Sequence, residues 1–318
     1  MYYLNLHHLL KVIFIQAVKM ETYSYSQNHF HILKQKYKGS DFLYYIQETD
    51  KPSLILKLFN IILLEEDKIK LPINEEKITR KQAEKLAKKT KTILEKSNCK
   101  KIILSKKIQK QEDYVNELYS YNFEIADGKW LFEVLIYKIL SYATKKNNLK
   151  KEETIVSILV NDMTENTFQN IKKIAKNYKR VNIVTNHMEK FKRMESGLLE
   201  KEGIMITVGN NKKKSLSKSQ IIINIDFPTE LINQYNIYEE AIIINIPGNI
   251  KIKKKRFNGT IINDYEIEFN NTEEFDYEKM QKYKAKEIYE AQIYQKQPFD
   301  NIMKKINKDQ VKIKELLR

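Results

Sequence analysis

Arginine, cysteine, glycine and proline are all scarce in this 318-residue chain, and each scarcity excludes something. Cys99 is the only cysteine, so neither an intrachain disulfide nor a cysteine-based zinc site can form. The 7 glycines and 5 prolines leave no stretch that is typical of a flexible linker. A single thiol fits a reducing compartment, and we expect a cytoplasmic protein.

The positive charge of the chain comes almost entirely from lysine. The formal net charge is +16, and only five of the 57 basic residues are arginine: Arg80, Arg180, Arg193, Arg256 and Arg318. Arginine reads base edges and clamps phosphates through a planar fork, so sequence-specific nucleic-acid binding is not expected. The abundance of Lys, Asn, Ile and Tyr is typical of an AT-rich bacterial genome. Non-specific binding to a polyanion needs only positive charge and stays open.

Hydrophobic residues make up 42% of the chain, which is enough for two packed cores. The apolar run at residues 9–18 is too short to span a bilayer, has no cleavage site and is interrupted by Lys11, so no membrane partner is expected. We interpret it as a core element, or as part of an N-terminal extension at residues 1–20 ahead of an alternative start at Met20.

The first half of the chain is expected to form a smaller α/β domain over residues 21–150. Its strands are predicted at residues 42–47, 54–64, 69–73, 101–105 and 123–126. Thr79 with Gln82 forms a capping-box pattern before a helical stripe that continues to residue 96. A further helix is predicted at residues 113–121, and Asp127 is expected to cap one long helix over residues 128–143.

The second half alternates short apolar strands with helices, which predicts a doubly wound, Rossmann-like α/β domain over residues 151–271. Strands are expected at residues 154–160, 181–185, 204–208, 221–225, 241–246 and 260–263. Thr164 is a predicted helix cap, Gly203 is a predicted helix end, and residues 212–218 are expected to form a short helix. Residues 272–318 are predicted to form C-terminal helices, with a break at Pro298.

Several strand ends resemble one group of NADP-binding Rossmann domains, the shikimate dehydrogenases and glutamyl-tRNA reductases. Thr185-Asn186-His187 before a helix is similar to the join that holds the 2′-phosphate of NADP in that group. Residues 219–226 (SQIIINID) resemble its fourth strand, and residues 241–248 (AIIINIPG) resemble its fifth. The likeness covers about a third of the chain. It implies NADP as cofactor, with Asn186 and His187 near the phosphate and Asp226 near the reacting end.

The glycine-rich phosphate loop of that group is not preserved. If Val160 ends the first strand, the three glycine positions are filled by Asn161, Met163 and Asn166. The glycines normally allow a tight turn and a close approach of the backbone to the pyrophosphate. Asp162 and Glu165 add negative charge, and His187 replaces an arginine, so we favour a scaffold over a conventional dinucleotide site.

Other candidate sites are weaker. The histidine pairs at positions 7, 8, 29 and 31 lack the further ligands that a metal requires, so no metal is expected. Cys99 has no identifiable base and is expected to be buried and inert. Two basic runs follow predicted strands and are candidates for an anionic ligand or partner: Lys212, Lys213 and Lys214, and Lys251, Lys253, Lys254, Lys255 and Arg256.

Three functional hypotheses remain open from the sequence. The first is a non-catalytic or cofactor-independent relative of NADP-binding dehydrogenases that acts through binding, including binding to a protein partner. The second is an NAD(P)-dependent oxidoreductase with a diverged loop. The third is a lysine-rich, non-specific nucleic-acid or polyanion binder. The sequence does not decide whether the protein is an enzyme, because no recognisable catalytic motif is present.

Overall fold

The computed structural model describes residues 43–65, 67–73, 77–97, 99, 101–270, 281–294 and 298–318. The predicted N-terminal extension, the apolar run at residues 9–18 and the four histidines at positions 7, 8, 29 and 31 lie outside the described residues. The chain divides into two compact units. Unit 1 comprises Met1–Ala126 and Tyr277–Ala291, and unit 2 comprises Asp127–Asp276 and Gln292–Arg318.

Unit 1 is built on a mostly parallel sheet with the strand order β2-β3-β1-β4-β5. The strands are β1 (Leu43–Glu48), β2 (Leu63–Glu65), β3 (Lys68–Leu71), β4 (Lys101–Leu104) and β5 (Glu124–Ile125). β2 runs antiparallel to β3, and the remaining pairs are parallel. In the register, Tyr44 lies opposite Ile102 and Tyr45 lies opposite Lys68. The strands therefore occupy close to the predicted positions, with one exception.

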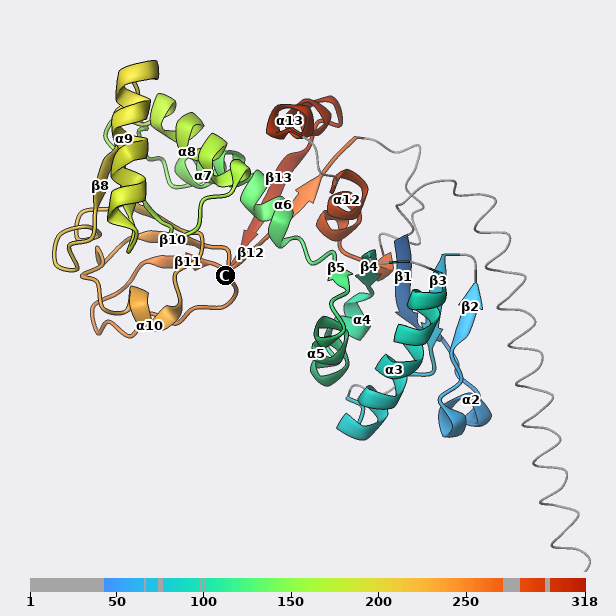
Figure 1. Ribbon diagram of the computed structural model, residues 1–318. Coiled ribbons are helices and arrows are strands. Elements are labelled where there is room, and N and C mark those ends of the chain that lie inside the picture. The colour runs from blue at the N-terminus through green and yellow to red at the C-terminus, as the bar shows by residue number, and fades with distance from the viewer. Residues whose placement is uncertain are drawn as a thin grey trace, which may run out of the picture. The chain divides into compact units, whose positions relative to one another are not determined.

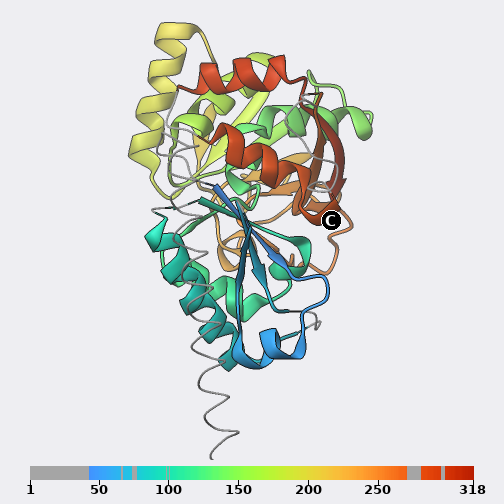
Figure 2. The same cartoon turned by 90° about the vertical axis from the view of Figure 1, so that its right-hand side faces the viewer.

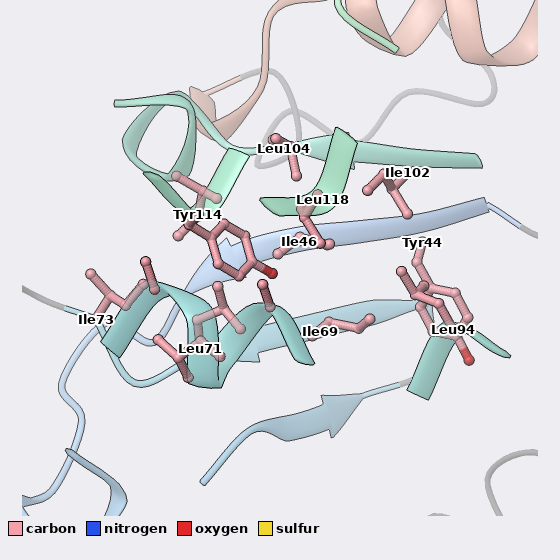
Figure 3. Close-up of a cluster of buried hydrophobic side chains, with 14 of the residues drawn as sticks. Tyr44, Ile46, Ile69, Leu71, Ile73, Leu94, Ile102, Leu104, Tyr114 and Leu118 are labelled. Carbon is pink, nitrogen blue, oxygen red and sulfur yellow. The ribbon is translucent and has the colours of Figure 1, made fainter. Parts of the chain in front are cut away.

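The core of unit 1 lies between this sheet and two helices, α3 (Arg80–Lys96) and α5 (Glu112–Ser120). Figure 3 shows Ile46, Ile69 and Ile102 of the sheet gathered with Leu94 of α3 and the α5 side chains. The stripe predicted for α3 is the buried face, and the Thr79 hydroxyl accepts the Gln82 N–H at 3.3 Å as the capping pattern requires.

The predicted strand at residues 54–64 is wrong over its first half, which forms the helix α2 (Leu54–Phe59). The Ser53 hydroxyl caps this helix by accepting the Leu56 N–H, and Asn60 ends it in the left-handed conformation at φ 49°. The periodicity of hydrophobic residues does not distinguish a helix from a strand in so short an apolar run. The capping residues on either side therefore determine that this segment is helical. The helix buries none of its side chains, and Leu54 is 74% exposed.

Unit 2 contains a six-stranded parallel sheet with the strand order β11-β10-β9-β6-β7-β8. The strands are β6 (Ile155–Leu159), β7 (Arg180–Val184), β8 (Thr207–Gly209), β9 (Ile221–Asn224), β10 (Ile242–Asn245) and β11 (Thr260–Ile262). The chain winds outward from β6 in one direction as far as β8, and then from β9 in the other. This order is the doubly wound Rossmann topology, and it confirms the predicted fold class.

Helices cover both faces of this sheet. α8 (Glu165–Asn177) and α9 (Met188–Glu202, yellow in Figures 1 and 2) connect β6, β7 and β8, and Lys172 of α8 pairs with Glu202 of α9 at 2.5 Å. α10 (Thr229–Ile232) connects β9 and β10. The predicted caps are confirmed, because the Thr164 hydroxyl accepts the Thr167 N–H and Gly203 ends α9 at φ 65°.

The single helix predicted at residues 128–143 is interrupted. It forms α6 (Lys129–Val134) and α7 (Ile136–Lys146), with a break at the fully buried Leu135. The buried side chain of Asn170 satisfies the broken backbone: its amide donates to the carbonyl oxygens of Glu133 and Val134, and its oxygen accepts the Tyr137 N–H. The tertiary partner, rather than a local sequence signal, therefore sets the break.

Two other segments differ from the predicted helices. Residues 212–218 form turns instead of a helix, because the Asn211 side chain accepts the Lys213 and Lys214 N–H groups. α13 (Phe299–Lys308) begins after Pro298 as predicted, but the chain then forms β13 (Lys312–Leu317), which pairs antiparallel with β12 (Asp264–Glu268). The end of the chain is therefore a strand.

The compact units divide the chain at residues 126 and 127, whereas the sequence predicted a domain boundary at residue 150. The reason is that α6 and α7 pack on α8 within unit 2. The predicted domain bounds remain a prediction. Among the described residues, no helix has the length and apolar character that crossing a membrane requires.

Candidate functional site

The carboxyl ends of β6 and β9 meet at the point where the sheet reverses its winding, and one carboxylate joins them. Asp226, just after β9, accepts the Asn161 N–H at 2.9 and 2.8 Å on its two oxygens. One of these oxygens also accepts the Asp162 N–H at 2.6 Å. These N–H groups begin the loop between β6 and α8, where a dinucleotide-binding Rossmann domain holds its pyrophosphate.

The environment of Asp226 is partly desolvated, and several neighbouring groups act on its pKa. Burial raises the pKa of Asp226 above its ordinary value, and the neighbouring Asp162 raises it further. The N–H groups of Asp162 and Asn161 and the nearby His187 act in the opposite direction. The group is half-buried and holds its backbone donors as an internal anion would.

Asn161 extends this arrangement to the next strand. Its side-chain oxygen accepts the Asn186 N–H at 2.9 Å, and the Asn186 oxygen accepts from the Asn210 amide at 3.3 Å. Tyr235 completes the chain by donating its hydroxyl to the Asn210 oxygen. The structure therefore brings together three of the predicted site residues, Asn161, Asn186 and Asp226, and also places His187 close enough to act on Asp226 electrostatically.

Met163 and Asn166 are not part of this network. Both are half-buried, and within the described part of the chain neither side chain hydrogen-bonds to Asn161 or Asp226. The start of α8 instead receives a second carboxylate, since Glu133 of α6 accepts from the hydroxyls of Thr164 and Thr167, the latter at 2.8 Å. A carboxylate of the chain itself therefore lies at each of the two places in this region that favour an anion. Asp226 accepts from the loop, and Glu133 lies at the start of α8.

A ladder of three asparagines, two of them fully buried, links the strands in the other half of the same edge. The Asn224 amide at the end of β9 donates to the Asn245 oxygen at 2.7 Å, and the Asn245 amide donates to the Asn263 oxygen at 3.1 Å. Asn224 also bonds both backbone groups of Phe227, at 2.9 Å each. Asn224 and Asn245 are fully buried, so every one of these amide bonds removes an unsatisfied polar group from the core.

The residues of this edge do not fit a dinucleotide in the conventional position. The N–H groups that would hold the pyrophosphate already bond to Asp226. Met163 carries a side chain where the backbone would have to approach the phosphates, and Asp162 and Glu165 are exposed carboxylates beside the loop. A bound diphosphate would face these charges without a basic side chain at the loop.

Unit 1 has a second polar cluster, at the carboxyl ends of β1 and β4. Glu48 accepts from the Ser105 hydroxyl at 2.6 Å, and Lys107 of α4 (Lys106–Gln109) lies 3.8 Å away from its other oxygen. Glu287 in α12 (Ala285–Ile293) accepts from the Gln109 amide at 2.7 Å. Gln47 accepts from the Tyr283 hydroxyl at 2.9 Å.

Burial dominates the acid–base behaviour of Glu287 in this cluster. Glu287 is 1% exposed, and its burial raises its pKa to about 7, although Lys284, Gln109 and Lys286 act to lower it. Cys99 in the same unit is buried, as expected, and burial raises the pKa of its thiol to about 12. The thiol is therefore protonated at neutral pH and is a poor nucleophile.

Sequence reasoning missed Glu48, Glu287 and Glu133 as site residues. Glu48 and Glu287 are far apart in sequence, and no local motif links them. The asparagine ladder did leave a signal, because the pattern Ile-Ile-Ile-Asn occurs at both Ile221–Asn224 and Ile242–Asn245. No group of three metal-ligating side chains converges in the part of the chain that the structure describes.

No protein-family model matches the chain, and no curated protein matches it either. Similar solved structures include the shikimate 5-dehydrogenase of Listeria monocytogenes in complex with shikimate and NAD (11% identity, 85% of this chain and 97% of that one, TM-score 0.31). The A chain of dipicolinate synthase from Bacillus subtilis is another, with 10% identity and a TM-score of 0.36. The match covers 74% of this chain and 84% of that one.

A putative malic enzyme is a third similar structure (15% identity, TM-score 0.27). The match covers 66% of this chain and 61% of that enzyme, so it spans about three fifths of the enzyme's length. Similarity at these levels carries no argument about activity. The assignment to a Rossmann-like fold rests on the strand order of unit 2.

Proposed function

We propose that unit 2 is a Rossmann-like scaffold that acts through binding, in the cytoplasm, without a dinucleotide in its strand-edge loop. The observation that carries this proposal is the Asp226 carboxylate on the N–H groups of Asn161 and Asp162. The chain supplies, from a neighbouring strand, the anion that a cofactor would otherwise supply. The loop then serves to join β6 to β9 instead of holding a ligand.

Electrostatics supports the same conclusion. Two unit charges about 5 Å apart interact by roughly 3 kcal/mol at an effective dielectric constant of 20, which is appropriate near a protein surface. A diphosphate at the loop would meet Asp226 and the exposed Asp162 and Glu165. It would also have to displace Asp226 from donors at 2.6 to 2.9 Å. Both costs oppose binding, and the position of the arginine that holds the phosphate in the resembling group is filled by His187.

The first test is a titration of the purified chain with NADPH and NADH, followed by thermal shift and calorimetry. We expect no saturable binding up to millimolar cofactor. Saturable micromolar binding that is lost in His187→Glu would contradict the proposal and favour an oxidoreductase with a diverged loop. Asp226 would then be the next residue to substitute.

A gain-of-function experiment tests the role of Asp226 directly. Asp226→Ala frees the N–H groups of Asn161 and Asp162, so we expect inorganic pyrophosphate to stabilise this variant and not the parent chain. Asp162→Ala is the matched control, because it removes a neighbouring carboxylate and leaves the N–H groups occupied. Equal stabilisation of both variants would show that charge alone, and not the occupied donors, excludes the anion.

A further inference from the structure

Two basic runs that are separate in the sequence lie against one short segment of unit 2. The first follows β8 and contains Lys212, Lys213 and Lys214, and the second follows β10 and contains Lys251, Lys253, Lys254, Lys255 and Arg256. Between them in sequence is the segment formed by α10 and residues 233–238. We call these eight cations, with the segment that joins them, the α10 basic surface.

Hydrogen bonds attach both runs to this segment. The Asn233 amide donates to the Lys251 carbonyl oxygen at 2.9 Å, and the Asn233 oxygen accepts the Lys253 N–H at 2.7 Å. From the other side, the Asn236 N–H donates to the Lys212 carbonyl oxygen at 2.7 Å. Because these three bonds are made by backbone groups of the lysines, they fix the two runs in place without using the ammonium groups. The Lys212 ammonium also donates to the Gln234 side-chain oxygen, which is an uncharged acceptor.

A shared hydrophobic core supports the surface from below. Leu216, Ile232 and Tyr235 are fully buried in one cluster, and Ile250, Ile252 and Phe257 pack against it. The isoleucines alternate with Lys251 and Lys253, which are exposed, so the pattern directs apolar side chains inward and charges outward. The segments that carry the cations are therefore packed against a hydrophobic core.

These charges are not neutralised locally. Within the described ranges, none of the eight cations has a carboxylate oxygen within 4.0 Å. The joining segment and its continuation to residue 240 carry three carboxylates, Glu230, Glu239 and Glu240, against eight positive charges. A surface of this composition carries a positive potential that attracts polyanions and is sensitive to salt.

The chemistry of the surface favours one class of polyanion. Seven of the eight cations are lysines, which bind phosphate as point charges and do not read base edges. An anionic membrane would be expected to take up apolar side chains as well, but the large exposed ones that the structure describes lie elsewhere, for example Leu54, Leu58 and Met205. The same lack of an apolar centre argues against a protein interface.

We infer that the α10 basic surface binds the phosphate backbone of nucleic acid without reading its sequence. This goes beyond the proposed function, because it names a partner and uses a surface distinct from the Asp226 loop. The two proposals also fail separately, since cofactor binding would overturn one and an absence of duplex binding the other.

The test is fluorescence anisotropy of a labelled 30-base-pair DNA duplex with the full chain over a range of salt. Two variants remove three cations each, Lys212→Gln/Lys213→Gln/Lys214→Gln and Lys253→Gln/Lys254→Gln/Lys255→Gln. The matched control is Lys81→Gln/Lys85→Gln/Lys88→Gln, which removes the same charge from exposed positions of α3 in unit 1. Each surface variant should weaken binding at least ~10-fold and reduce the slope of log K against log salt by about 2, and the control by less than about 2-fold.

Three results would overturn the inference. Duplex binding that the control weakens as much as the surface variants would mean that scattered charge is responsible. An absence of saturable duplex binding at 50 mM salt would rule out nucleic acid as the partner. Binding to phosphatidylserine vesicles that the surface variants abolish, without duplex binding, would assign the surface to a membrane instead.

Discussion

The sheets of the two units both bury polar groups at the carboxyl ends of their parallel strands, but they use different chemistry. In unit 2 the edge is fastened mainly by amides, in the ladder of Asn224, Asn245 and Asn263. In unit 1 the edge is held by carboxyl groups, with Glu48 on Ser105 and Glu287 on Gln109. Amides do not titrate, whereas a buried carboxyl does, so the two edges should respond differently to pH.

The exception within unit 2 is Asp226, and it sharpens the comparison. Asp226 accepts from backbone N–H groups of the loop, whereas Glu48 accepts from the Ser105 hydroxyl and Glu287 accepts from the Gln109 side-chain amide across the unit. Backbone donors at a strand end are the groups that bind phosphate in other Rossmann domains. In unit 2 the Asp226 carboxylate therefore occupies backbone donors that could otherwise bind a ligand. In unit 1 the Glu48 and Glu287 carboxyl groups instead link segments that are distant in the sequence.

The largest effect is expected from the asparagine ladder. Asn224→Ala leaves the backbone groups of Phe227 and the Asn245 oxygen without their partner in a buried position. We expect a loss of about 3 kcal/mol of unfolding free energy, the same at pH 5.5 and 8.5. Urea unfolding followed by Trp130, the single tryptophan, reports on unit 2. Asn258→Ala at an exposed position is the control, and a pH-dependent loss would contradict the comparison.

The pH dependence of unit 1 is the next largest effect. The pKa of Glu287 is raised to about 7 in the folded state, so the folded state holds the proton more tightly than the unfolded state. The stability that this provides is complete below the unfolded pKa and is lost as pH rises through about 7. We expect unit 1 to lose about 2 kcal/mol between pH 5.5 and 8.5, measured by hydrogen exchange of its peptides.

Glu287→Gln provides the matched variant for this prediction. Glutamine can still accept from Gln109 but does not titrate, so the pH dependence of unit 1 should become flat. Hydrogen exchange of peptides from unit 2 serves as the internal reference. A pH dependence that survives the substitution would mean that another group is responsible.

Asp226 is expected to have a smaller effect because it is only half-buried. Asp226→Ala should cost about 1–2 kcal/mol, since two N–H groups of the loop lose a charged acceptor but gain access to water. Asp226→Asn keeps one acceptor oxygen and should cost less. Chemical denaturation of both variants is the measurement, and a larger loss for the asparagine variant would contradict the assigned hydrogen bonds.

The helix caps offer the smallest effect and a calibration between the units. Thr79→Ala in unit 1 and Thr164→Ala in unit 2 each remove a hydroxyl that accepts an N–H in the first turn. Each should cost about 1 kcal/mol, with Thr164 slightly above Thr79 because it also bonds to Glu133. Losses of this size that do not depend on pH in either unit, measured by denaturation, would show that the units differ at their edges and not in their helices.

Local patterns in the sequence were sufficient for much of the fold. Apolar runs such as Ile242–Asn245 and punctuating residues such as Thr79, Thr164 and Gly203 predicted where elements begin and end. The same patterns failed where a distant partner decides, as at Leu135, where Asn170 interrupts a helix, and at residues 312–317, which pair with β12. Helix and strand are not separable in a short apolar run such as Leu54–Phe59.

The candidate site divides in the same way. The sequence determined the residue types at the strand ends, the loss of the glycines at positions 161, 163 and 166, and the charge of the two basic runs. Only the tertiary structure decided which groups meet. It pairs Asp226 with Asn161 and Glu287 with Gln109. It also attaches one basic run to the Asn233 side chain and the other to the Asn236 backbone N–H. The sequence sets the chemical type of each side chain, but its hydrogen-bond partner depends on which distant strands the fold places side by side.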